Sequence, residues 1–230
     1  MIVEWLPPHI SADLSLVSGF LTWIIILGWL WHSGWKIQRR YFIEVSQKPL
    51  SRNEIVWGAG IVGAFFFVGA QMRPGMPAVM TVAMIGALSG YVDARTHRLP
   101  NMYTVVMGVG VVVGALVGTL ISPMWPERLV GFAVGALIWL VPIAILNRLP
   151  GGMGGGDVKI APVLGAMVGS VGLHAAVFAL ALSFVSAGLA ALWQIVVGSA
   201  GTKSRVAMGP WMIGSALLGA IAWGVVPDWL

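Results

Sequence analysis

The stretch Arg148-Leu-Pro-Gly-Gly-Met-Gly-Gly-Gly-Asp-Val-Lys159 joins a glycine-rich loop to an apolar run through a single carboxylate. Positions 151 to 156 are all glycine except Met153. Glycine lets the backbone turn freely and lets another chain approach closely, because it has no Cβ. An aspartate at the start of an apolar membrane helix is unfavourable, which makes it a functional candidate. Asp157 is therefore the first candidate site residue.

A second aspartate occupies a comparable place. The chain has four aspartates, and those at positions 13 and 228 lie near its ends. Asp93 follows another apolar run, in the stretch Tyr91-Val-Asp-Ala-Arg-Thr-His-Arg-Leu-Pro-Asn101. We expect Asp93 and Asp157 to belong to one site.

The composition is that of a membrane protein. Of the 230 residues, 58% are hydrophobic and 9% are charged, and the mean hydropathy is +0.91. No cysteine is present, which excludes disulfides, zinc–thiolate sites and cysteine nucleophiles. The four histidines are scattered along the chain, so we expect no metal site and no cofactor. The net charge of +5 could suggest nucleic-acid binding, but the basic residues fall where membrane insertion places them.

The apolar runs predict an all-α, polytopic membrane protein with about eight transmembrane helices. The expected helices cover about residues 16–35, 55–70, 77–92, 102–121, 129–146, 157–170, 173–197 and 210–226. Pro142 could kink the fifth helix, and a tight turn is expected at Arg73-Pro-Gly. The first fifteen residues contain no Lys or Arg, so we expect the first run to be a retained helix and not a cleaved signal.

The basic residues test this topology. With the N-terminus outside, eleven of the thirteen fall in cytoplasmic loops: Lys36, Arg39, Arg40, Lys48, Arg52, Arg95, Arg98, Arg148, Lys159, Lys203 and Arg205. Only Arg73 and Arg128 fall outside, so the positive-inside rule fixes the orientation. Two crossings separate Asp93 from Asp157, which places both at the cytoplasmic membrane boundary. Two close carboxylates share a proton, and such a pair supplies the acid and the base that peptide-bond hydrolysis needs.

Paired motifs give the chain a resemblance to a known family. Gly154-Gly155-Gly156-Asp157 fits the GxGD pattern of intramembrane-type aspartic proteases. Asp157-Val-Lys159, Asp93 followed by Leu99-Pro100-Asn101, and Met208-Gly209-Pro210 are similar to the prepilin peptidase branch. The likeness covers about residues 77–226. The presenilin branch fits less well, because it carries a Tyr-Asp pair and a Pro-Ala-Leu sequence that this chain lacks.

The resemblance implies an aspartic endopeptidase that removes the leader peptide of type IV prepilins or pseudopilins at the cytoplasmic face of a bacterial or archaeal membrane. Asp93 and Asp157 match the catalytic aspartates, and residues 154–156 are expected to bind substrate backbone. We expect an N-terminal two-helix region at 1–76, with a basic loop at 36–54, and a peptidase core at 77–230. Many relatives carry a cysteine-rich domain in that loop and also methylate the new N-terminus. Here the loop is short and cysteine-free, so N-methylation has no support.

Each candidate also has a structural interpretation. Asp157 could simply cap a helix, and Asp93 could be a solvated loop residue paired with Arg95 or Arg98. Lys159, two positions after Asp157, is expected on nearly the opposite side of the helix, with its ammonium at the membrane interface. His97 and its basic neighbours are most simply topology determinants.

Two other classes of protein remain open. A transporter could use the same carboxylate pair to relay protons or bind a cation, and it should show related halves and broken helices. No internal repeat is visible in the sequence. A catalytically silent assembly protein would tolerate loss of either carboxylate.

Overall fold

The computed structural model describes residues 8–70, 75–122, 124–150, 152–197 and 207–222, and all the regular structure in these ranges is helical. The elements are α1 (Pro8–His32), η2 (Gly34–Lys36), α2 (Ile37–Glu44), α3 (Arg52–Gly69), α4 (Met76–Thr96), α5 (Asn101–Ile121), α6 (Trp125–Asn147), α7 (Gly155–Gly169), α8 (Leu173–Val196) and α9 (Gly209–Ala222). The all-α prediction is confirmed.

Five helices, α1, α4, α5, α6 and α8, are long and apolar enough to cross a membrane, so the chain is a multi-pass membrane protein. All eight helices expected from the sequence are present, as α1 and α3 to α9. However, α7 and α9 have only 15 and 14 residues, while α3 has 18 but begins with the polar residues Arg52, Asn53 and Glu54. None of the three is among the five, so eight crossings stay a prediction. Helix α6 continues through Pro142, while the expected turn at 73–75 lies mostly outside the described residues.

The polar segment between α1 and α3 is folded against the bundle. Gln38 is fully buried, and its Nε2 donates to the carbonyl oxygens of Leu50 at 2.9 Å and Trp35 at 3.2 Å. The N–H of Leu50 donates in turn to Oε1 of Gln38 at 3.3 Å. These bonds tie α2 to the segments that flank it, and α2 packs beside α4, where the sequence predicted only a polar loop.

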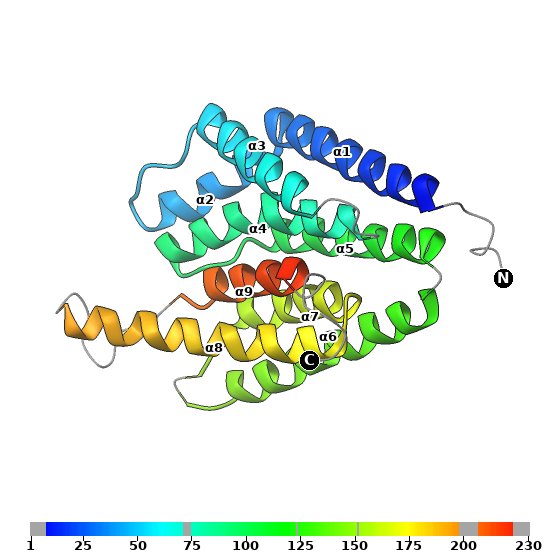
Figure 1. Ribbon diagram of the computed structural model, residues 1–230. Coiled ribbons are helices and arrows are strands. Elements are labelled where there is room, and N and C mark those ends of the chain that lie inside the picture. Colours follow the sequence, from blue (N-terminus) through cyan, green and yellow to red (C-terminus); the bar gives the residue numbers. More distant parts are fainter. Residues whose placement is uncertain (1–7, 71–74, 123, 151, 198–206, 223–230) are drawn as a thin grey trace.

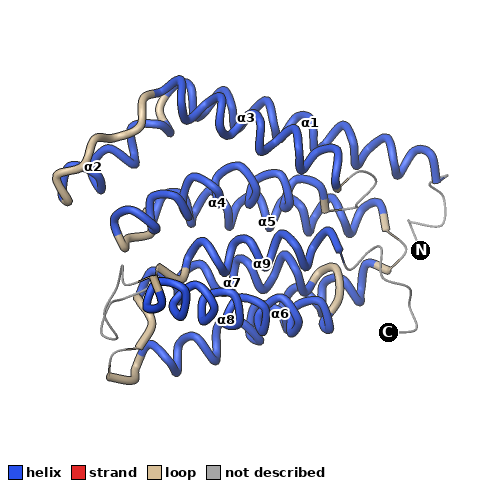
Figure 2. The backbone as a smooth tube through the Cα atoms, turned by 60° about the vertical axis from the view of Figure 1, so that its left-hand side comes forward, coloured by secondary structure: helices blue, strands red, loops and turns tan. Residues whose placement is uncertain are grey.

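Helix α4 is the centre of the molecule, and 89% of its apolar window is buried. Figure 2 shows α1 and α3 above α4 and α5, with α6, α7, α8 and α9 below them. Helix α5 packs closely on α4 because Gly110 and Gly114 have no side chain. A Cβ at these positions would collide with Thr81 and Ala78, respectively. Figure 1 shows the same central position of α4 between α3 and α9.

Helices α6 and α7 make the closest helix pair. Gly131 and Gly135 on α6 face Gly165 and Gly169 on α7, and a Cβ added at Gly135 would lie 2.7 Å from Cα of Gly169. Small residues at this spacing let two backbones touch. The pair therefore holds α7, with Asp157 in its first turn, firmly against the helix that precedes the glycine loop.

Candidate active site

Asp93 lies in the last turn of α4. The helix ends at Thr96, and the C-cap residue His97, whose backbone is left-handed (φ 51°), donates its N–H to the Asp93 carbonyl at 2.8 Å. The Asp93 side chain is 6% exposed, and its Oδ2 accepts a hydrogen bond of 3.0 Å from the backbone N–H of Gly209. Because Gly209 begins α9, this bond joins the ends of two helices that are distant in sequence.

Asp157 lies in the first turn of α7 and is 7% exposed. Its Oδ2 accepts a hydrogen bond of 3.1 Å from the N–H of Gly154. Gly154, and not Asp157, is the N-cap residue, since the helix begins at Gly155. A carboxylate in the first turn is stabilised by the helix dipole. Asp157 therefore does stabilise the start of α7, but from the third position of the helix and not as its N-cap residue.

The two carboxylates line one cavity of about 300 Å³. The structure thus brings together the two aspartates that the sequence singled out. The other residues that line the cavity come from α2, the α4–α5 connection, the start of α5, the glycine loop and α7: Tyr41, His97, Arg98, Leu99, Asn101, Gly154, Gly155, Gly156 and Lys159.

The side chain of Leu99 packs between the glycine loop and the start of α9. A Cβ added at Gly156 would lie 3.1 Å from Cβ of Leu99, and one added at Gly209 would lie 3.2 Å from its Cδ2. The Leu99 side chain is buried and therefore touches both the glycine loop and the start of α9. Only glycine fits at these two places without movement of Leu99.

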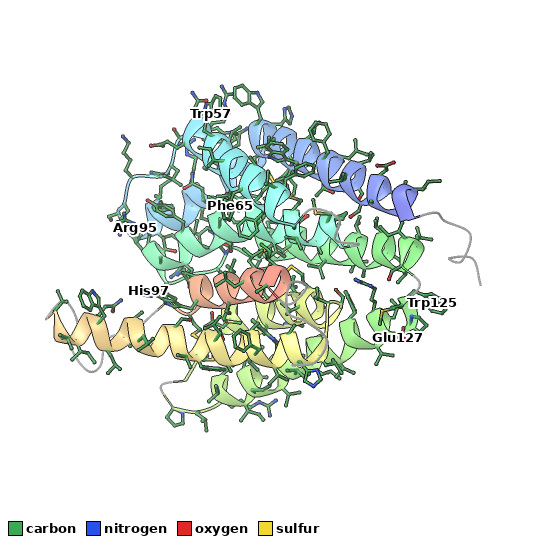
Figure 3. The ribbon with its side chains drawn as sticks, viewed as in Figure 1. Trp57, Phe65, Arg95, His97, Trp125 and Glu127 are labelled. Atoms are coloured by element: carbon green, nitrogen blue, oxygen red, sulfur yellow. The ribbon has the colours of Figure 1, made fainter. Side chains whose placement is uncertain are left out.

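Neither Arg95 nor Arg98 forms an ion pair with Asp93 among the described residues. Arg98 forms an ion pair with Glu44 of α2, and Glu44 also pairs with Arg40 at 3.0 Å. Arg95 stacks over the Tyr91 ring, with its Cζ 5.5 Å from the ring centroid. Figure 3 shows Arg95 and His97 at the end of α4 that carries Asp93, while Trp125 and Glu127 lie at the other end of the molecule.

Lys159 differs from its expected placement. Its Nζ donates to Oδ1 of Asn101 at 3.0 Å, and its side chain lines the same cavity as Asp157. Cα–Cβ bonds of a helix tilt toward its N-terminus, so the long lysine stem reaches back from the second turn to the start of α5. The prediction from the two-residue spacing of Asp157 and Lys159 did not take the length of the lysine side chain into account.

No group of three or more His, Cys, Asp or Glu side chains that could hold a metal ion occurs among the described residues. Two contacts at the cavity were not predicted from the sequence: the N–H of Gly209 as the partner of Asp93, and the pair of Lys159 with Asn101. Each lies in a motif quoted above, but its contact joins segments that are far apart along the chain.

A comparison with protein families gives one match. The model of the type IV leader peptidase family matches residues 79–195, about half of the chain. The matched region includes Asp93, the glycine loop and Asp157, and it ends before Gly209. No curated protein and no solved structure matches the chain.

Proposed function

This chain belongs to the type IV leader peptidase family, and on that premise we propose that it is an aspartic endopeptidase with Asp93 and Asp157 as its catalytic pair. Because the chain belongs to this peptidase family and has several helices that can cross a membrane, it is a membrane-embedded protease. One observation carries the finer assignment: two buried carboxylates from different helices line a single open cavity. The presence of both aspartates in the matched region supports it.

The reaction needs one carboxylate ionised and the other protonated. The ionised group takes a proton from a water molecule as the water oxygen attacks the scissile carbonyl carbon. The resulting tetrahedral intermediate loses its C–N bond as the second carboxyl group gives its proton to the leaving amine. Close carboxylates favour this state, because ionising both at once is unfavourable. Bond breaking and proton transfer then yield a free carboxyl group and a free amine.

The substrate we propose is a type IV prepilin or pseudopilin, cut between its leader and its hydrophobic helix. A helical peptide has its carbonyl groups engaged and crowded by side chains, so the segment at the site must be extended. Residues 154–156 line the cavity, and a Cβ added at Gly155 would meet nothing within 4 Å. This open glycine edge suits close approach of substrate backbone beside Asp157.

The proposed orientation places the cavity at the cytoplasmic face of a bacterial or archaeal membrane. Arg98 and Lys159 line the cavity, and basic residues gather on the cytoplasmic side of membrane proteins. We also keep the division into a two-helix region at 1–76 and a peptidase core at 77–230 as part of this proposal.

The test is cleavage of a prepilin from the same cell, in membranes that contain this protein, with the new N-terminus identified by mass spectrometry. The proposal expects one cut between leader and hydrophobic helix. An intact prepilin, together with proton or cation flux in vesicles that depends on the protein, would favour a transporter. Against a transporter, the carboxylates lie at helix ends and not near mid-helix.

A further inference from the structure

The candidate cavity has a second polar feature besides the two carboxylates. Lys159 from α7 and Asn101 from the start of α5 are joined by a hydrogen bond of 3.0 Å, and both side chains line the cavity. Both residues are exposed, so the pair lies where the cavity opens. The hydrolysis described above makes no use of either residue.

The ammonium group of Lys159 has capacity for a ligand. An ammonium carries three N–H donors, and Asn101 accepts from it through one oxygen. Neither carboxylate of the cavity forms an ion pair with it among the described residues. A lysine used only for charge balance would be expected to pair with Asp93 or Asp157. Instead Asn101 holds the ammonium at a separate place in the same cavity.

We propose that Lys159 is a substrate-binding residue that donates to a backbone carbonyl oxygen of the extended segment beside Asp157, and that Asn101 positions its ammonium. This inference rests on the proposed peptidase function and adds a residue to that site. A neutral carbonyl is favoured over a carboxylate as the ligand, because Asp93 and Asp157 would repel a second anion in so small a cavity.

The proposed bond fixes the register of the substrate. The glycine edge at 154–156 allows the peptide to lie close, but glycine offers no side chain to stop it from sliding. A charged donor one helical turn or less from Asp157 supplies a fixed point. The interaction is made in the bound substrate before chemistry begins, so its loss should appear mainly in KM.

The test compares Lys159→Met, Lys159→Arg and Asn101→Ala in the full-length protein, with prepilin cleavage measured over a range of substrate concentrations. Loss of a charge-assisted hydrogen bond predicts that Lys159→Met raises KM between about tenfold and about a hundredfold. The value of kcat should change by less than about twofold. Lys159→Arg should restore most of the affinity, and Asn101→Ala should give a smaller rise in KM.

Lys48→Met is the matched control, because Lys48 is exposed, lies on the same proposed membrane side and does not line the cavity. It should leave KM unchanged. Thermal melting will show whether Lys159→Met is poorly folded. In that case the KM values of Lys159→Arg and Asn101→Ala test the proposal instead. An unchanged KM in folded Lys159→Met, with Lys48→Met behaving alike, would overturn the proposal.

The failure of this inference differs from failure of the peptidase assignment. If Asp93→Asn and Asp157→Asn abolish cleavage while Lys159→Met keeps a normal KM, only the role of Lys159 is lost. If the two aspartate variants cleave normally, the site itself is wrong, whatever Lys159→Met does.

Discussion

Each of the two aspartates receives a hydrogen bond from a glycine N–H. Gly209 donates to Asp93 and Gly154 donates to Asp157, at 3.0 and 3.1 Å. The bond orients one oxygen of each carboxylate and leaves the other for water or a peptide group. At Gly209 the approach is close enough that the absence of a side chain matters, since an added Cβ would lie 2.7 Å from Oδ2 of Asp93.

We therefore predict that Gly209→Ala lowers the cleavage rate at least about tenfold, because the new methyl group displaces the Asp93 carboxylate. The rate is measured as prepilin processed per unit of enzyme in membranes. Gly214→Ala on the same helix is the control, since its Cβ would meet nothing within 4 Å. Equal rates for both variants would show that the contact with Asp93 is not needed.

The proposed sharing of one proton between Asp93 and Asp157 predicts a bell-shaped dependence of cleavage on pH. At low pH both carboxyl groups are protonated and no base remains, while at high pH both are ionised and no acid remains. The initial rate, measured from about pH 4 to about pH 9, should fall on both sides of an optimum. Unchanged thermal stability across that range excludes unfolding as the cause. A rate that is level across the range would contradict the shared pair.

The residues of the site were partly predictable. Asp93 and Asp157 stand out because aspartate is rare in this apolar chain, and the glycine loop marks the second of them. The roles of Gly209 and Leu99 could not be read, because they depend on which helix ends meet. The place of the Lys159 ammonium in the same cavity as Asp157 was not predicted, because its reach to Asn101 depends on side-chain conformation.

Among the elements, the pairing of α6 with α7 fixes where Asp157 lies. An added Cβ at Gly169 would lie 2.7 Å from Cα of Gly135, so any side chain there separates the helices. We predict that Gly169→Ala lowers the free energy of unfolding by about 2 kcal/mol, a usual effect of overpacking, and also lowers the cleavage rate. Thermal melting in detergent measures the first effect.

Gly188→Ala on α8 is the control for that substitution, because its Cβ would meet nothing within 4 Å. Alanine is also a better helix former than glycine, so this control should be neutral or slightly stabilising. A melting temperature of Gly169→Ala equal to that of Gly188→Ala would mean that α6 and α7 are not in backbone contact.

The docking of α2 provides another test at this scale. Gln38→Ala removes the bonds to Leu50 and leaves the Leu50 N–H and carbonyl without that partner, at a loss of about 1–3 kcal/mol. We expect faster protease cutting within residues 45–51 of the folded protein. The exposed Arg40→Ala change, which removes a surface ion pair with Glu44, should leave the cutting rate nearly unchanged.

The long helices were predictable because an apolar run of about twenty residues is typical of a helix that crosses a bilayer. Helix α2 was not, since its eight residues carry charged side chains and its position depends on buried Gln38. The bounds of α1 were also off, because the helix begins at residue 8 in a less apolar stretch than the run expected at 16–35.

The whole molecule has a proposed orientation that single cysteines can test, because the chain has none of its own. In intact cells, a membrane-impermeant maleimide should label Met124→Cys and leave Ser46→Cys unlabelled. Both positions are exposed, and they lie at opposite ends of the bundle. Permeabilised cells should show labelling of both. Labelling of Ser46→Cys alone in intact cells would reverse the orientation and move the cavity outside.

The overall class could be read from composition, since 58% hydrophobic residues and 9% charged residues fit a membrane protein. The number of crossings could not, because α7 and α9 are shorter than a usual span and their position depends on packing around buried α4.

The most direct test of the central claim is prepilin cleavage by Asp93→Asn and Asp157→Asn in membranes, beside the wild-type protein. Each substitution is nearly isosteric, keeps an oxygen that can accept the glycine N–H, and removes ionisation. We predict loss of processing in both variants at normal expression and membrane insertion. Full processing by either variant would contradict a shared carboxylate pair as the source of the activity.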